Sequence, residues 1–215
     1  MVYWSLKRGV PVIANFAINT EKIKGKKADF IEKSNDELSP DYLINYALNY
    51  ANGKRIKEGS LLLVIDECQL MFNAREWNVK GRAEWLSFFT QHRKFGYDII
   101  LVAQFDRMID RQIRALIEYE QIHRKVSNFG IKGKILSLIM GGNVFVSVKV
   151  WYPMKEKTGA DFFHARKKYY SLYDTFNMFG SGTGGGTGSP PVTEPNMLPV
   201  QPDDNACCVL DNSNT

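Results

Sequence analysis

A short apolar run, Leu61–Ile65, ends abruptly in two adjacent carboxylates, Asp66 and Glu67. A run this short and this apolar is typical of a strand buried on both faces, as in the centre of a parallel sheet. A second apolar strand is predicted over 98–104, where it also ends in a polar residue, and a helix is predicted between the two strands over 82–95. Because two parallel strands need such a crossover, the spacing predicts a β-α-β unit and hence an α/β fold.

The flanking sequence predicts further elements of this fold. β-Branched residues indicate a strand over 10–16, and Ser39 followed by Pro40 begins an amphipathic helix that ends at Asn52. A third helix is expected over 110–119. Two strands, ILSLIMGG and NVFVSVKVWYP, flank a Gly-Gly-Asn turn and predict a C-terminal β-hairpin.

The composition changes at the end of the chain. Residues 180–215 hold five of the eight prolines and no Lys or Arg, so we expect a disordered tail after a domain that spans 1–179. The domain carries 28 basic and 19 acidic side chains. A basic surface attracts nucleic acid, anionic lipid headgroups or nucleotide phosphates, although an ordinary solvated surface explains the same charge equally well.

Sorting signals and cysteines point to a cytoplasmic setting. No apolar run approaches the roughly 20 residues of a membrane-spanning helix, and the first residues do not form a signal peptide. The three cysteines are Cys68, Cys207 and Cys208, which match neither a metal-ligand spacing nor a disulfide framework. We therefore expect a reducing, intracellular environment.

The polar strand ends carry the candidate chemistry. Ligands bind at the carboxyl ends of parallel strands, where Asp66, Glu67 and Gln104 are expected to emerge together. An Asp directly after an apolar strand can hold Mg²⁺, and the next Glu can polarise a water for attack on a terminal phosphate, which is the Walker B arrangement. Gln104 is placed to bind the same water or the γ-phosphate. A simpler interpretation, that Asp66 caps a following helix with Glu67 in its first turn, remains open.

A phosphate-binding loop is missing from this sequence. No G-x-x-x-x-G-K-[ST] motif occurs, because Gly25-Lys26-Lys27 lacks the upstream glycine and the glycine run near Gly184 has no lysine. The backbone N–H groups and the lysine that hold phosphates are therefore absent from the printed chain. This absence argues against ATP hydrolysis by the chain as it stands.

Three stretches together resemble one protein family. LLLVIDECQLMF, TQHRKFGYDIILVAQ and DRMIDRQIRALIEYEQIHRK resemble the zonular occludens toxin family, additional-strand P-loop ATPases that filamentous phages use to assemble and extrude the virion. The resemblance covers roughly residues 1–175. It implies a P-loop NTPase-like parallel sheet flanked by helices, with ATP and Mg²⁺ as cofactors.

The resemblance also implies roles for individual residues and partners. Asp66 would position Mg²⁺, Glu67 would activate water and Gln104 would sense the γ-phosphate. Ring assembly would bring a basic side chain into the neighbouring site; the candidates for this role are Arg107, Arg111 and Arg114. Each of these arginines is also explained by a solvated helix face. Phage assembly and coat proteins are the expected partners, with membrane association only through them, in the host cytoplasm or at the cytoplasmic face of the inner membrane.

The start of the chain departs from the family pattern. MVYWSLKRG resembles the second half of the helix that ordinarily follows the phosphate loop. We expect either a truncated sequence or a degenerate member, so enzymatic activity of this chain is left open. The alternative function is a non-enzymatic assembly or single-stranded DNA-binding module, using the basic residues of 22–33 and the segment RKKYY at 166–170.

Overall fold

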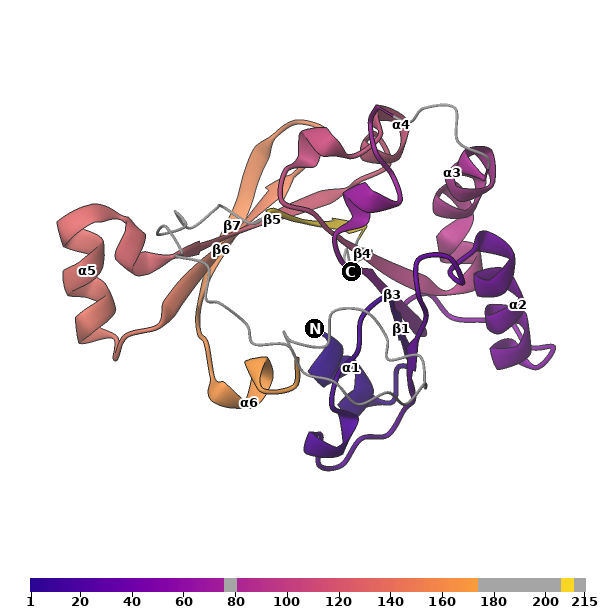
Figure 1. Ribbon diagram of the computed structural model, residues 1–215, viewed down its shortest axis with the longest axis horizontal. Helices are drawn as coiled ribbons and strands as arrows, with labels where there is room; N and C mark the ends of the chain where they lie inside the picture. The colour runs from indigo at the N-terminus through magenta and orange to yellow at the C-terminus, as the bar shows by residue number, and fades with distance from the viewer. Residues whose placement is uncertain (76–80, 174–205, 211–215) are drawn as a thin grey trace, which may run out of the picture.

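The computed structural model describes residues 1–75, 81–173 and 206–210, and these form one eight-stranded mixed sheet with helices around it (Figure 1). The strands are β1 (Val12–Ala14), β2 (Phe30–Glu32), β3 (Leu61–Ile65), β4 (Tyr97–Val102), β5 (Tyr119–Lys125), β6 (Val144–Trp151), β7 (Glu156–His164) and β8 (Ala206–Leu210). The α-helices are α1 (Val2–Arg8), α2 (Pro40–Ala51), α3 (Arg82–Gln91), α4 (Arg111–Arg114), α5 (Gly130–Ile139) and α6 (Lys167–Tyr170). Short 3₁₀ turns are η1 (Thr20–Lys22), η2 (Cys68–Leu70), η3 (His92–Phe95), η4 (Asp106–Met108) and η5 (Val126–Asn128).

Four neighbouring strands, in the order β2-β1-β3-β4, are parallel. β3 lies between β1 and β4, and Leu63 is opposite Ile13 on one side and Ile99 on the other. All five residues of β3 are buried, as expected for a strand with both edges paired and both faces covered. The predicted β-α-β unit and the α/β class are confirmed.

The side chains of the parallel strands alternate between two cores. Leu61, Leu63 and Ile65 pack on one face with residues of α2 and α3, including Leu43 and Phe88. Leu62 and Val64 pack on the other face, in the cluster that contains Leu6 of α1. Because successive side chains of a strand point to opposite faces, one apolar run supplies both cores.

Local sequence signals set the ends of α2 and α3, the two helices that pack against Leu61, Leu63 and Ile65. The Ser39 hydroxyl accepts a hydrogen bond from the Tyr42 amide at 3.2 Å, and α2 ends at Asn52 in the left-handed conformation, as predicted. The predicted second helix is α3 continued by η3, and Gly96 ends it with φ of 75°. A Cβ at Gly96 would lie 2.7 Å from a side-chain carbon of Ile56, so the turn into β4 requires glycine.

The other four strands, β8-β5-β6-β7, pair in antiparallel fashion, and here the sequence prediction is partly wrong. The hairpin exists, but it joins β6 to β7 through residues 152–155, whereas ILSLIMGG lies mostly in α5. Only Arg111–Arg114 of the helix predicted over 110–119 is α-helical, because the chain turns into β5 at Tyr119. The short strand β2 was not predicted.

The end of the chain supplies one unexpected strand. Ala206–Leu210 forms β8, which pairs antiparallel to β4 on one side and to β5 on the other. The predicted tail therefore contains one described strand; the rest of it, 180–205 and 211–215, lies outside the described residues. β8 alone connects the parallel strands to the antiparallel ones, because β4 and β5 are not neighbours in the sheet. No helix in the described part of the chain is long and apolar enough to cross a membrane.

Candidate functional site at the ends of the parallel strands

Asp66 leaves the carboxyl end of β3 in a backbone geometry set by Asn15, which follows β1. The Asp66 amide donates to Asn15 Oδ1 at 2.7 Å, and Asn15 Nδ2 donates to the Asp66 carbonyl at 2.8 Å. Asn15 Nδ2 also donates to Asn35 Oδ1 at 2.8 Å. One amide side chain thus ties the ends of two adjacent strands together and orients the first acid of the site. Sequence reasoning missed this role, although Asn15 is the polar residue near the end of the strand predicted over 10–16.

The Asp66 carboxyl group is half-buried, and burial raises its pKa. The neighbouring charge of Glu67 raises the pKa further, while a hydrogen bond of 2.9 Å from the Glu67 amide to Asp66 Oδ1 opposes the rise. A carboxylate that is poorly hydrated and close to a second acid gains most from a bound cation. The donor chemistry of Asp66 therefore fits Mg²⁺ held through one carboxylate, with waters and phosphate oxygens as its other ligands.

Glu67 has an unusual backbone conformation for a residue with a side chain, with φ of 47°. Non-glycine residues in this region are uncommon and gather at functional sites. The Glu67 carboxylate accepts a hydrogen bond from the Gln69 side-chain amide, and Gln69 is itself buried. Neither acid caps the following turn with its side chain, because η2 begins at Cys68 and its N-cap residue, Glu67, makes no such bond. The helix-cap interpretation of the acid pair is therefore wrong.

Gln104 follows β4 at the same edge of the sheet as the acids. The last pair between β3 and β4 is Ile65 with Leu101, and β4 ends at Val102. Gln104 is therefore three residues beyond that pair and two beyond the end of the strand. Its side chain is exposed, and no hydrogen bond joins it to Asp66 or Glu67 among the described residues. The structure therefore places Gln104 beside the site without bringing it into contact with either acid.

The three candidate arginines lie on the segment after β4. Arg107 is in η4 and exposed, while α4 carries Arg111, which is exposed, and Arg114, which is half-buried. Asp110 is the N-cap of α4: its Oδ1 accepts from the Gln112 amide at 2.8 Å. The arginines thus project from a short element whose start is fixed by one buried acid.

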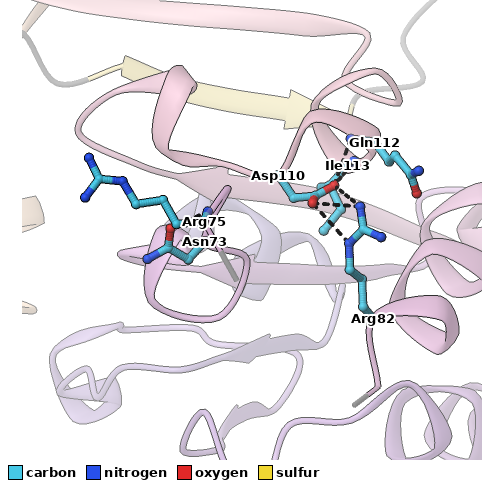
Figure 2. A network of polar contacts seen from close by, with 6 residues as sticks. All are labelled: Asn73, Arg75, Arg82, Asp110, Gln112 and Ile113. Atoms are coloured by element: carbon cyan, nitrogen blue, oxygen red, sulfur yellow. Dashed lines mark hydrogen bonds and ion pairs between the residues drawn. The ribbon is translucent and has the colours of Figure 1, made fainter. Parts of the chain in front are cut away.

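Asp110 is held in turn by Arg82 at the start of α3. Figure 2 shows the two side chains pointing toward each other, with Arg82 Nη2 2.8 Å and Nε 3.0 Å from Asp110 Oδ2. Burial alone would raise the pKa of Asp110, but the Gln112 amide and the Arg82 guanidinium outweigh it and lower the pKa. Asp110 was not singled out in the sequence, because its partner is 28 residues away.

The segments after β3 and β4 are also joined through their backbones. Asn73 forms an isolated antiparallel bridge with Ile109, and the Asp110 amide donates to the Phe72 carbonyl at 2.8 Å. Figure 2 shows Asn73 beside Arg75, whose side chain points away from Asp110. The chain that follows the acids and the chain that carries the arginines therefore form one connected unit.

A basic and aromatic surface lies near the acids. Lys168 Nζ lies 5.1 Å, 5.8 Å and 4.7 Å from the ring centroids of Tyr3, Trp4 and Tyr169. An open cavity of about 600 Å³ adjoins this cluster; its lining includes Tyr3, Phe16, Phe163, Arg166, Tyr169 and Tyr173. Burial raises the pKa of Tyr173, one of the lining residues, and the charges of Asp66 and Glu67 raise it further. We call Lys168, Tyr3, Trp4 and Tyr169 the Lys168 cluster.

Comparisons with known proteins agree with the resemblance found in the sequence. The model of the family "Zonular occludens toxin (Zot)" matches residues 4–174. Gene 1 proteins of Enterobacteria phages I2-2 and M13 are 32% and 33% identical over 129 residues, which is 56% of this chain and 35% and 37% of those proteins. The Gene 1 protein of Escherichia phage If1 is 31% identical over 153 residues, 67% of this chain and 43% of that protein. The chain therefore spans less than half the length of these relatives.

Two solved structures are similar to the chain with TM-scores below 0.5. The N-terminal domain of zonular occludens toxin from Neisseria meningitidis has a TM-score of 0.44 at 16% identity, covering 77% of this chain and 80% of that one. The genome packaging NTPase B204 from Sulfolobus turreted icosahedral virus 2, in complex with ATP-gammaS, has a TM-score of 0.42 at 13% identity, with coverage of 75% and 85%. Since the family model matches residues 4–174, which is most of the sequence, the chain belongs to the zonular occludens toxin family.

Proposed function

We propose that this chain supplies the metal- and water-binding half of an ATP hydrolysis site in a phage assembly ATPase. The observation that carries the proposal is the acid pair at the end of the central buried strand, with Asp66 tied to β1 through Asn15. Asp66 is partly desolvated and Glu67 is held in a left-handed backbone conformation. Two adjacent carboxylates in this position suit a metal ligand followed by a base for water.

Each side chain has a proposed role in phosphoryl transfer. Mg²⁺ would supply charge neutralisation for the phosphate oxygens, and Asp66 would hold it at the end of β3. The Glu67 carboxylate accepts the proton of the attacking water, and the Gln69 amide orients that carboxylate. Gln104 would donate to the γ-phosphate from the end of β4. Arg107, Arg111 or Arg114 would reach the site of a neighbouring copy in a ring, where a guanidinium stabilises the charge of the transferring group.

The proposal assigns only the acidic half of the site to these residues. The printed sequence contains no G-x-x-x-x-G-K-[ST] motif, so other residues must hold the β- and γ-phosphates. The work done by hydrolysis would be virion assembly or extrusion, with phage assembly and coat proteins as partners at the cytoplasmic side of the host inner membrane.

ATP turnover tests this proposal. We would measure it on the printed chain and on the longest product that the gene encodes in frame around it, with Mg²⁺. In whichever form is active, Glu67→Gln should lower turnover about 100-fold, the usual contribution of a general base. The matched control is Glu156→Gln, which neutralises an exposed acid on β7, outside the parallel strands. Turnover that survives Glu67→Gln unchanged would remove Glu67 from the mechanism, and absence of turnover from both products would refute the ATPase proposal.

Single-stranded DNA binding is a second candidate, favoured by the Lys168 cluster. Lys22 Nζ donates to the Ser171 carbonyl at 2.8 Å, which brings the start of the basic segment 22–33 next to the residue that follows the segment 166–170. Aromatic rings beside lysines suit stacking on bases and contact with phosphates. The opposing interpretation is that these rings only pack the domain edge, as the 5.3 Å edge contact between Tyr3 and Tyr169 shows that they partly do.

Binding of a fluorescent oligothymidine separates these interpretations. We expect affinity that falls steeply with salt and that drops about tenfold in Lys168→Ala, since each phosphate contact contributes to a counterion-dependent term. Lys157→Ala on β7, an exposed lysine outside the cluster, is the matched control. Absent or salt-independent binding would refute the DNA hypothesis and leave the ATPase proposal untouched.

A further inference from the structure

The helix α5 packs against the rest of the protein through its smallest residues. Gly133 and Ser137, one helical turn apart, are its buried positions. A Cβ at position 133 would overlap the carbonyl oxygen of Val126, so the contact between α5 and η5 requires glycine at this position. Since the contact face is occupied by small residues, the large side chains of α5 are turned away from the protein.

These large side chains form an exposed aliphatic stripe. Ile131, Ile135, Leu138 and Ile139 are 77%, 54%, 80% and 77% exposed, and their spacing of three and four residues places them on one helix face. This face lies opposite Gly133 and Ser137. In Figure 1, α5 projects at the end of the molecule farthest from the parallel strands, beyond β6 and β7. Among the described residues nothing covers the stripe, which forms one continuous apolar surface, unlike the scattered single exposed residues that are normal on proteins.

The charges around the stripe identify the kind of surface that would cover it. Lys132 and Lys134 are exposed on the same helix, beside the aliphatic side chains. The stretch 121–155 holds six Lys and Arg and no Asp or Glu. An isologous contact between two copies through this face would bring four lysines together without an acid from this stretch to pair with them, which is unfavourable. A surface that is both apolar and anionic suits the face better.

We propose that α5 is a membrane-surface helix that lies in the interface of an anionic lipid bilayer. The four aliphatic side chains enter the boundary between headgroups and acyl chains, and Lys132 and Lys134 extend toward lipid phosphates. A single helix of ten residues gives weak, reversible binding, so α5 orients the protein on the membrane and does not anchor it. This proposal differs from the expectation that membrane association occurs only through partners, because it gives the chain a direct contact of its own.

Vesicle co-sedimentation tests the proposal with the full chain. The wild type should bind vesicles of phosphatidylcholine mixed with phosphatidylglycerol. Its affinity for vesicles of phosphatidylcholine alone should be about tenfold lower, because two lysines near an anionic surface contribute at least a tenfold gain in affinity. Lys132→Gln/Lys134→Gln should abolish this preference. Leu138→Ser/Ile139→Ser should lower binding to the mixed vesicles about tenfold or more, since two buried aliphatic side chains are lost from the interface.

The control variant carries the same kind of change elsewhere. Leu48→Ser/Leu70→Ser alters two leucines that are 58% and 70% exposed outside α5, and it should bind like the wild type. Equal binding of the α5 variant and this control would overturn the proposal, as would absence of wild-type binding to the mixed vesicles. Size-exclusion chromatography with light scattering gives the remaining outcome: an oligomer that Leu138→Ser/Ile139→Ser dissociates, without vesicle binding, would assign the stripe to a protein contact and refute the lipid assignment.

Discussion

The two halves of the sheet are built in different ways. In the parallel half, β3 and β4 have five and six residues, and nine of these eleven are buried between two layers of side chains. In the antiparallel half, β7 has nine residues and none of them is buried. Among the residues whose burial is described, the small core cluster of this half consists of Val126, Val144 and Val146. The parallel half is thus stabilised by burial, while the antiparallel half depends on its ladders and on cross-strand contacts such as the stacked rings of Phe145 and Phe163.

The helices repeat this difference. α2 and α3 turn Leu43, Phe88 and Phe89 inward, whereas α5 turns Gly133 and Ser137 inward and leaves its aliphatic residues exposed. The same kind of apolar side chain therefore serves the core in one half and an external surface in the other. The half that carries the acid pair is stabilised by burial, and the other half presents apolar side chains on its surface.

Truncation of one leucine in each half should give the largest contrast. Leu63→Ala removes a fully buried side chain from the middle of β3 and should lower the free energy of unfolding by about 2–5 kcal/mol. Leu138→Ala on α5 should change it by no more than about 0.5 kcal/mol, because the side chain is 80% exposed. Urea unfolding followed by circular dichroism measures both. A similar loss in both variants would mean that α5 is covered in solution.

Breaking the ion pair between Arg82 and Asp110, the N-cap residue of α4, should have the next largest effect on the free energy of unfolding. Arg82→Gln leaves Asp110, which is 5% exposed, without its guanidinium partner and should cost about 2 kcal/mol at neutral pH. The lowered pKa of Asp110 means that the stability of the pair is complete above the ordinary value of 3.8 and is lost as pH falls through the folded value. Urea unfolding at pH 7 and pH 3 should therefore show a smaller acid destabilisation in Arg82→Gln than in the wild type. Arg75→Gln, whose side chain points away from Asp110, is the control and should behave like the wild type.

The clamp between β1 and β3 should have a smaller effect. Asn15→Ala removes two hydrogen bonds to the Asp66 backbone and one to Asn35, and should cost about 1–2 kcal/mol because the group is only partly buried. Asn35→Ala loses one of these bonds and should cost less. Hydrogen exchange of the Asp66 amide gives a local readout, and unchanged protection in Asn15→Ala would show that the clamp does not form in solution.

Neutralising Asp66 should have the smallest effect and the opposite sign. Its raised pKa means that the stability contributed by the group is present below 3.8 and is lost as pH rises through the folded value. At pH 7 the ionised group is therefore a cost, and Asp66→Asn should raise the free energy of unfolding by about 0.5 kcal/mol. Unfolding measured between pH 4 and pH 7, about the range in which a raised carboxyl pKa acts, should show this gain only at the upper end. A loss of stability at pH 7 would mean that burial does not dominate at this carboxyl group.

The parallel half was largely predictable because its patterns are local. Leu61–Ile65 is too short for a buried helix and too apolar for a surface strand, and Ser39-Pro40 marks a helix start by itself. The segment 135–142 was mispredicted because a short apolar run does not distinguish a buried strand from a helix. In the structure most of this segment belongs to α5, which packs on η5 through Gly133. The strand β8 was missed because its two partner strands, β4 and β5, are distant in the chain.

The candidate site divides in the same way. Asp66 and Glu67 could be singled out because they directly follow a strand that the sequence identifies. Asn15 and Asp110 could not, because their partners lie 51 and 28 residues away. Gln104 was expected at the same edge of the sheet as the acids, and it lies there, two residues beyond the end of β4. Its side-chain position depends on the path of that loop, which no local pattern describes.

By itself, the sequence determined which segments are buried strands, where two of the helices begin and end, and which acids stand at the end of the central strand. These features depend on neighbours within a few residues, whose spacing and turn chemistry are visible in the text of the chain. Only the tertiary structure decided which face of α5 is turned outward, where Ala206–Leu210 pairs, and how Asn15 and Arg82 hold the two sides of the site. Those outcomes depend on contacts between distant segments, and their free energies exist only once the chain has brought the partners together.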